Sequence, residues 1–285
     1  MNQYKVQALN IFPVKSLRGF SVSKMSLAPS GFMYDRQWML VDVNAKFLTQ
    51  RQLPRMALVD VTIDEQYLRF AAPQMDLLEI MLKAGNIAGI TDKTTKTNKI
   101  NVKIWSDECV GLLAEERINQ WFSEFLAVDC RLVQFDQSQP RQVDQDYSDN
   151  TQDQVCFADG FPFLIIGSAS LDDLNCRLNE KGESSVPMMR FRPNIVIETD
   201  EPFIEDYWSK ITIEGIKMQL VKPCSRCVIP TIDIQSAQKS KEPIETLKSY
   251  RKYDGKIFFG QNVIHQFNPG QSITVGDTLT LVSQP

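Results

Sequence analysis

The residues with the clearest chemical potential are two cysteines, Cys224 and Cys227, in the segment 222–231. A C-x-x-C pair is typical of half a zinc site, of a dithiol redox pair, or of one metal-binding thiolate with a neighbouring cysteine. Structural zinc takes four ligands, yet the other four cysteines form no second pair and His265 is the only histidine. A thioredoxin-type pair opens a helix, whereas Pro230 and the β-branched residues after it favour a loop. Two inert cysteines in a turn remain an alternative from this segment alone.

Cationic and hydrogen-bonding side chains occur at three other places, each at an end of a strand-like run. They are Lys15 with Ser16, Arg36, and Arg192 with Asn194. Each alone is typical of a solvated surface. Together, cations and a hydroxyl suit a phosphate dianion, so beside a cysteine thiolate they predict an anion-binding pocket next to a soft metal ligand.

The elements that must position these residues begin with a β-rich region, residues 1–105. Strands are predicted at 6–14 and 38–43, and a hairpin at 58–63 and 67–70. The polar stretch 91–98 is expected to be an exposed loop. Apolar residues then recur at helical spacing and predict an amphipathic helix; they are Ile118, Trp121, Phe122, Phe125 and Leu126.

The second half mixes helices and strands after the segment 136–154, which is rich in Asp, Gln and Ser and is expected to be a solvated linker or a lid. A strand at 163–166 precedes a helix that is predicted to start with a capping box at Ser170. The remaining predicted elements are strands at 194–198, 211–213 and 217–221, a short helix from Pro243 to Tyr250, and a hairpin at 273–281 that closes a barrel.

The composition limits the class of protein. A chain of 285 residues exceeds the usual single-domain size, so two domains are expected. A net charge of −4 and a pI near 5.3 argue against a nucleic-acid partner. The single histidine argues against most zinc hydrolases and Ser-His-Asp enzymes.

The expected location is the cytoplasm, without a membrane partner. No signal-peptide pattern opens the sequence, and no run approaches the ~18 apolar residues of a spanning helix. The six scattered cysteines are therefore expected to be reduced thiols.

Six segments occur in order along the sequence: F-P-V-K-S-L-R-G (12–19), D-R-Q-W (35–38), F-R-P-N (191–194), C-S-R-C (224–227), E-P-I-E-T-L-K-S-Y-R (242–251) and F-G-Q-N (259–262). Together they resemble the motifs of MOSC proteins, which are named for the C-terminal domain of molybdenum cofactor sulfurase, and in particular those of bacterial relatives of the mitochondrial amidoxime reducing component. The resemblance implies a β-rich α+β fold: an N-terminal β-barrel-like domain (1–120), a helix and polar linker (121–154), and a MOSC-type β-barrel domain with flanking helices (155–285).

The resemblance also implies roles for individual residues. Cys227 matches the thiolate that ligates molybdenum, and Lys15, Ser16 and Arg36 match positions that grip the cofactor's phosphate. Arg192 and Asn194 match positions facing the pterin and the metal, and Asn194 is expected with Cys227 at the catalytic centre. The turn Asp159-Gly160-Phe161 matches backbone lying against the pterin, where Gly160 permits close approach. Arg226 is expected either to lower the pKa of the Cys227 thiol or to lie on the surface, and Cys224 to pack or to support the site.

Two departures from the family pattern concern the substrate pocket and the electron supply. Vertebrate relatives carry Thr-Thr where this chain has Pro230-Thr231 and Thr-Ser where it has Gly160-Phe161, so two hydroxyl contacts are lost. Some bacterial relatives carry a C-terminal ferredoxin domain, and the sequence shows no such cysteine run.

The implied function is a reductase of N-hydroxylated or N-oxygenated small molecules that uses the molybdenum-molybdopterin cofactor (Moco). Its electrons are expected from a separate ferredoxin, flavodoxin or flavin reductase. Two alternatives stay open: a non-catalytic carrier of the cofactor or of sulfur, and an interaction module stapled by zinc or a disulfide at Cys224 and Cys227.

Overall fold

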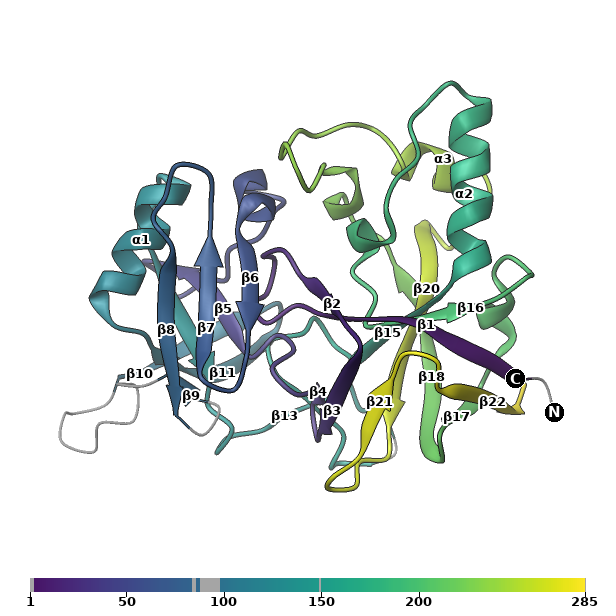
Figure 1. The fold of residues 1–285 in the computed structure, drawn as a ribbon, viewed down its shortest axis with the longest axis horizontal. Coiled ribbons are helices and arrows are strands. Elements are labelled where there is room, and N and C mark those ends of the chain that lie inside the picture. Colours follow the sequence, from purple (N-terminus) through teal and green to yellow (C-terminus); the bar gives the residue numbers. More distant parts are fainter. Residues whose placement is uncertain (1–2, 84–85, 88–97, 149, 285) are drawn as a thin grey trace.

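The computed structural model describes residues 3–83, 86–87, 98–148 and 150–284, which form two lobes side by side (Figure 1). The lobe on the left is built mainly from strands of residues 38–135, and the lobe on the right from the first strand and residues 163–283. The predicted β-rich α+β class is confirmed. The stretch expected as a loop at 91–98 lies, apart from residue 98, outside the described residues. Within those ranges, no helix combines the length and the hydropathy needed to cross a membrane.

The right-hand lobe contains a closed barrel of seven strands. Each strand pairs with the next around the ring, and the pair β15–β20 closes it. All pairs are antiparallel except β15–β16, which helix α2 (Ser168–Glu180) connects. In order around the barrel, the strands are β15 (Phe163–Gly167), β16 (Ile195–Glu198), β1 (Gln3–Ile11), β22 (Thr278–Ser283), β17 (Lys210–Ile213), β18 (Ile216–Ser225) and β20 (Lys256–His265).

Alternation along the strands fills this barrel with apolar side chains. In the hairpin of β17 and β18, whose strands the sequence predicts, buried Ile211, Ile213 and Met218 alternate with exposed Lys210 and Lys217. Successive side chains of a strand point to opposite faces, so one set lies inside the barrel and the other faces out. The barrel core is continuous across β1, β15, β16 and β20.

The start of α2 differs from its prediction. The helix begins at Ser168, two residues before the expected capping Ser170, and it has no side-chain cap. Ser170 lies inside the helix and is fully buried, and its hydroxyl donates to the carboxylate of Glu205 at 2.8 Å. Glu205 also accepts the backbone N–H of Gly167. The Ser170 hydroxyl, which the capping-box pattern predicts at the start of the helix, therefore binds a residue distant in the sequence, Glu205.

The predicted hairpin at 273–281 is wrong. β21 (Ser272–Thr274) pairs with β3 (Lys24–Ala28), whereas β22 pairs with β1 and β17. The turn between β21 and β22 bonds to other segments, because the N–H of Val275 donates to Ser23 and that of Gly276 to Val6. The chain thus leaves the three-stranded sheet of β21, β3 and β4 (Gly31–Phe32) and enters the barrel. The predicted closure of the barrel by the C-terminal residues is retained through β22.

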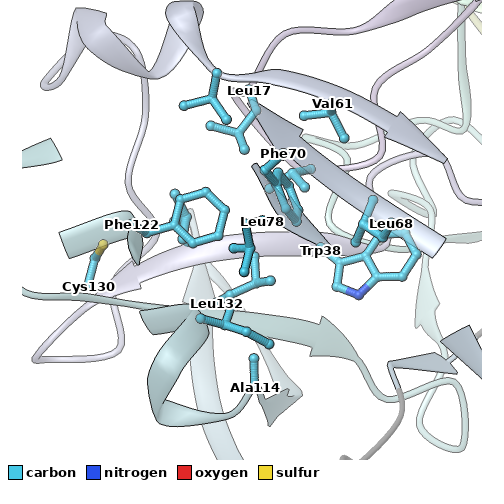
Figure 2. Close-up of a cluster of buried hydrophobic side chains, with 14 of the residues drawn as sticks. Leu17, Trp38, Val61, Leu68, Phe70, Leu78, Ala114, Phe122, Cys130 and Leu132 are labelled. Atoms are coloured by element: carbon cyan, nitrogen blue, oxygen red, sulfur yellow. The ribbon is translucent and has the colours of Figure 1, made fainter. Parts of the chain in front are cut away.

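The left-hand lobe packs two four-stranded sheets and a helix around one apolar core (Figure 2). The predicted amphipathic helix is confirmed as α1 (Glu116–Leu126), with Ile118, Phe122 and Phe125 buried. Phe122 lies 5.0 Å from the Phe70 ring, edge to face. The strands of the two sheets are β10 (Lys99–Ile104), β11 (Asp107–Leu113), β12 (Cys130–Phe135) and β5 (Trp38–Asp42), and β6 (Asp60–Ile63), β7 (Tyr67–Ala71), β8 (Leu78–Lys83) and β9 (Asn86–Ile87).

The polar segment 136–154 joins the lobes and has structure of its own. Its strand β13 (Arg141–Gln142) pairs with β14 (Gln154–Val155), and Arg141 is buried. The remaining strands are β2 (Phe20–Val22) and β19 (Lys252–Tyr253), and short 3-10 helices lie at Pro54–Leu58, Met188–Phe191 and Ile204–Tyr207. Helix α3 (Ile244–Lys248) confirms the short helix predicted after Pro243. The division of the chain at residues 120 and 154 stays a prediction.

Gly260, in the F-G-Q-N segment of β20, has no room for a side chain. Its φ is +81°, and an added Cβ would lie 2.6 Å from Ile166 Cγ1 and 2.8 Å from the carbonyl oxygen of Ile165. We expect Gly260→Ala to lower the free energy of unfolding by roughly 3 kcal/mol, through backbone strain plus overpacking. Gly255→Ala is the matched control in urea denaturation: its φ is +73° but its Cβ would meet nothing, so about 1 kcal/mol is expected. Equal losses would show that the clash contributes nothing.

His265, at the end of β20, gives a second stability prediction. Its ring packs edge to face on Phe163 at 5.0 Å, and its Nε2 lies 3.0 Å from the carbonyl oxygen of Ala28. Burial lowers the pKa of His265 to about 4. As the pH falls, the imidazole of the unfolded chain therefore takes up a proton before that of the folded protein does. His265 thus lowers the free energy of unfolding between pH 6.5 and about pH 4, by roughly 3 kcal/mol in total.

The test compares His265→Gln, which keeps a donor near Ala28, with the wild type. Chemical denaturation at pH 7 and pH 4.5 should show a smaller loss of stability on acidification in the variant. Since His265 is the only histidine, identical losses in the two proteins would contradict the buried, neutral imidazole.

Candidate functional site

A cleft between the two lobes ends in a small inner pocket. The outer cleft has a volume of about 1190 Å³ and is lined from one side by Trp105 and Arg51 and from the other by Lys222 and the C-S-R-C segment. The inner pocket, of about 160 Å³, shares Arg51, Asp159 and the cysteine segment with the cleft. The structure brings all nine predicted site residues to this inner pocket: Lys15, Ser16, Arg36, Asp159, Gly160, Phe161, Arg192, Asn194 and Cys227.

The cysteine segment lies at the end of a strand. β18 ends at Ser225, and a short 3-10 helix (Ile229–Thr231) follows, so Cys227 sits in the connecting turn with an exposed side chain. The N–H of Arg226 donates to the carbonyl of Ile257 on β20 at 2.7 Å and fixes this turn. The predicted loop therefore holds Cys227, whereas Cys224 still belongs to strand β18, and no helix opens at the pair.

Cys224 and Arg226 contact each other. The Arg226 guanidinium donates to Cys224 Sγ at 3.1 Å and to the carbonyl of Phe191 at 2.8 Å. Cys224 is partly buried against the apolar cluster that includes Phe191 and Phe259. The Arg226 guanidinium, one expected role of which is to lower the pKa of Cys227, therefore contacts the sulfur of Cys224 instead.

The other cysteines are poorly suited to act as thiolates. Burial raises the pKa of Cys109, Cys130 and Cys156 to about 11. Cys176 is exposed on α2 and lines neither the cleft nor the inner pocket. Among the residues that the structure describes, no three His, Cys, Asp or Glu side chains gather into a group able to hold a metal ion. A metal held by one thiolate and an organic ligand needs no such group.

Among the cations that line the inner pocket are the three that the sequence predicts, Lys15, Arg36 and Arg192. The Lys15 ammonium donates to the carbonyl of Phe157 at 2.9 Å and pairs with Asp159. Burial lowers the pKa of Lys15 despite this partner. Burial, with the neighbouring Arg36 guanidinium, also lowers the pKa of Arg192 to about 9. A lowered pKa of a cationic group means that its surroundings do not fully compensate its positive charge. A bound anion would provide that compensation.

The backbone at these positions is held in an uncommon conformation. Ser16, Arg36 and Arg192 have φ values of +65°, +48° and +59°. Left-handed backbone is costly for residues other than glycine and persists where the surroundings fix it, which occurs often at binding sites. Here it directs the side chains of three separate segments into one pocket.

Asn194 connects the cations to the barrel. Its side chain is 1% exposed, and its Oδ1 accepts from Arg36 Nη1 at 2.9 Å and from the N–H of Leu164 at 3.3 Å. Its Nδ2 donates to the carbonyl of Asn10. These contacts orient Arg36, and the catalytic role of Asn194 stays a prediction.

The turn 159–161 lines the inner pocket together with the cysteine segment. An added Cβ on Gly160 would meet nothing within 4 Å, so a planar group can approach this backbone closely. Phe161 packs edge to face on Tyr147 at 5.8 Å, and Asp159 accepts from the Trp105 indole N–H at 3.1 Å. With a thiol, guanidinium groups and an ammonium in one pocket, the residues present fit a phosphorylated pterin that brings a soft metal.

Three residues near the pocket were not found from the sequence. Arg51 stacks on Trp105 with 4.6 Å from its guanidinium carbon to the ring centroid, and both line the outer cleft. Arg141 binds the backbone before Gly160. No spacing pattern marks these positions, because Arg51 and Trp105 lie outside the strands and Arg141 lies in the short strand β13, and only contacts between distant segments bring them to the cleft.

Comparisons with known proteins agree with this geometry. The family model described as the MOSC N-terminal beta barrel domain matches residues 3–129, and that of the MOSC domain matches residues 152–280. Mitochondrial amidoxime-reducing component 1 of Homo sapiens is 37% identical over 298 residues, covering 98% of this chain and 83% of that protein. The Mus musculus protein is 36% identical with similar coverage. Molybdenum cofactor sulfurase of Oryza sativa is 33% identical over 90% of this chain, but over 32% of its own length.

Two family models match in the order that the motifs predict, and relatives at this identity run along nearly the whole sequence. The chain therefore belongs to the MOSC family, as a protein with an N-terminal MOSC barrel domain followed by a MOSC domain, and it is homologous to the mitochondrial amidoxime-reducing components.

Proposed function

We propose that this protein is a Moco-dependent reductase that removes oxygen from N-hydroxylated small molecules such as amidoximes. The observation that carries the proposal is the convergence of an exposed thiol, Cys227, and three cations on one inner pocket at the end of a wide cleft. The relatives named amidoxime-reducing components, similar over almost the full length, support this substrate class.

The residues of the pocket would divide the work between holding the cofactor and admitting the substrate. Lys15, Ser16 and Arg36 would bind the cofactor's phosphate, and Arg192 and Asn194 would face the pterin and the metal. Cys227 would supply a thiolate ligand to the metal. When bound, the cofactor supplies two-electron redox exchange and an acceptor for the substrate oxygen.

The outer cleft would take the organic part of the substrate. Its volume admits a planar aromatic molecule, and Trp105 and Phe161 line it above the cysteine segment. The reaction consumes two electrons and two protons and converts an amidoxime to an amidine and water. The electrons would come from a separate ferredoxin, flavodoxin or flavin reductase.

The test is reduction of benzamidoxime by purified, cofactor-loaded protein with a reduced viologen as electron donor. Formation of benzamidine that exceeds the viologen-only background supports the proposal. Protein that holds molybdopterin but forms no benzamidine would instead favour a non-catalytic carrier of the cofactor or of sulfur. About one zinc per chain with no molybdenum would favour the stapled interaction module and contradict the proposal.

A further inference from the structure

A buried arginine in the segment 136–154 holds the backbone that forms one wall of the inner pocket. The Arg141 guanidinium donates from Nη1 to the carbonyls of Cys156 at 3.0 Å and Ala158 at 2.6 Å, and from Nη2 to the carbonyl of Asp159 at 2.9 Å. Its Nε donates to the carboxylate of Asp107 at 2.7 Å. One side chain thus binds three carbonyls of a four-residue stretch and a carboxylate of β11 in the left-hand lobe.

The position of Arg141 is itself fixed. It lies in β13 directly opposite Val155 of β14, so the pairing sets it beside the stretch that it binds. Its side chain is 7% exposed, and its carboxylate partner Asp107 begins β11 at the tip of the β10–β11 hairpin. The same hairpin tip carries Trp105, whose indole N–H donates to Asp159.

The stretch that Arg141 binds also holds the ammonium group of Lys15, which lines the inner pocket. Phe157 offers its carbonyl to the Lys15 ammonium, and Asp159 pairs with the same ammonium. Gly160, the next residue, faces the open pocket. A shift of this backbone would therefore move both the Lys15 ammonium and the surface that Gly160 presents.

We propose that Arg141 is a positioning residue for cofactor binding: it clamps the backbone 156–159 in the conformation that holds Lys15 and presents Gly160 to the pterin. The inference rests on the proposed binding of Moco. Arg141 lines the outer cleft but not the inner pocket, so it acts on the cofactor through the loop.

The planar guanidinium is essential to this role. It presents donors in several fixed directions, whereas an ammonium presents three donors from a single atom. Arg141→Lys keeps the charge but cannot reach three carbonyls and Asp107 together. We expect its affinity for molybdopterin to fall at least about tenfold, since comparable losses follow when supporting groups around a metal ligand are changed.

The experiment compares Arg141→Lys and Arg141→Ala with a matched control, Arg131→Lys. Arg131 on β12 also donates to two backbone carbonyls, Asp42 at 3.2 Å and Val43 at 3.0 Å, but it lines neither the cleft nor the inner pocket. Molybdopterin per chain is measured after purification from a molybdenum-replete host. Hydrogen exchange of residues 156–161 and the thermal midpoint are measured on cofactor-free protein.

Both Arg141 variants are expected to lose molybdopterin and to show faster hydrogen exchange at residues 156–161. Arg131→Lys should show neither change, even if its thermal midpoint is similar to theirs. Adding methylguanidinium should restore part of the molybdopterin binding to Arg141→Ala. The clamp would be overturned if the Arg141 variants kept the molybdopterin content and the hydrogen exchange of the wild type. It would also be overturned if the loss of molybdopterin followed the thermal midpoint across all variants, Arg131→Lys included. Wild-type protein without molybdopterin would instead overturn the proposed function, and the clamp's role in cofactor binding with it.

Discussion

Replacing Cys227 by serine is expected to abolish the reduction of benzamidoxime, whereas Cys224→Ala should retain most of it. The Cys227 side chain is exposed in the turn that faces the pocket, while Cys224 is partly buried against apolar residues and receives the Arg226 guanidinium. A serine hydroxyl stays protonated near neutral pH and is a harder ligand than a thiolate. Changes to outer partners of a metal already cost 10–100-fold, so loss of the protein's own ligand should reduce activity by about a hundredfold or more.

The comparison between the two cysteines tests the ligand assignment. Turnover is measured together with molybdenum and molybdopterin content, and X-ray absorption counts the sulfur atoms around the metal. Cys227→Ser should lose one sulfur neighbour, and Cys224→Ala none. Equal loss of activity in both variants, or an unchanged sulfur count in Cys227→Ser, would contradict the assignment.

Arg36→Ala is expected to weaken the binding of molybdopterin by about 30- to 150-fold. A lost hydrogen bond to a charged group costs roughly 2–3 kcal/mol, and each 1.4 kcal/mol is a factor of ten. Arg36 is oriented by Asn194 at 2.9 Å and by the carbonyl of Arg192 at 3.2 Å, so its free donors have a fixed direction. Cofactor content and titration of cofactor-free protein with molybdopterin measure the effect.

Two further variants separate binding from stability. Arg36→Ala leaves Asp35, 4% exposed, without its ion-pair partner, so its thermal midpoint should also fall. Arg36→Lys keeps the charge and should bind more weakly than wild type with a smaller change in midpoint. Arg69→Ala, at a partly exposed position of β7, breaks two surface ion pairs and should leave cofactor binding unchanged. Wild-type affinity in both Arg36 variants would show that the phosphate is held elsewhere.

The sequence predicted the main elements because their signals are local. The stripe of α1 and the alternation in β17 and β18 each follow from one continuous segment. The site was predicted through motifs, which bring Lys15, Arg36 and Cys227 together without any knowledge of the strand pairing. In the structure they do line one pocket, and their individual roles stay predictions.

The errors have a common physical cause, which is competition from distant partners. The hydroxyl of Ser170 binds Glu205 and not the start of its own helix. The residues around Val275 bond to Ser23 and Val6, so β21 and β22 separate. Arg141 lies in a stretch whose composition indicates a solvated linker, yet a carboxylate and three carbonyls compensate its burial. None of these partners is visible within a local window.

The place of β1 in the barrel affects how this chain can be made and cut. Its residues 3–5 pair with residues 278–280 of β22, and its other edge pairs with β16 (Figure 1). During translation the ring cannot be completed until residues 278–283 have been made, so β1 must wait, unpaired on that edge, until β22 is available. An expression fragment restricted to residues 152–280 would leave β16 and β22 as open edges, and such edges promote aggregation.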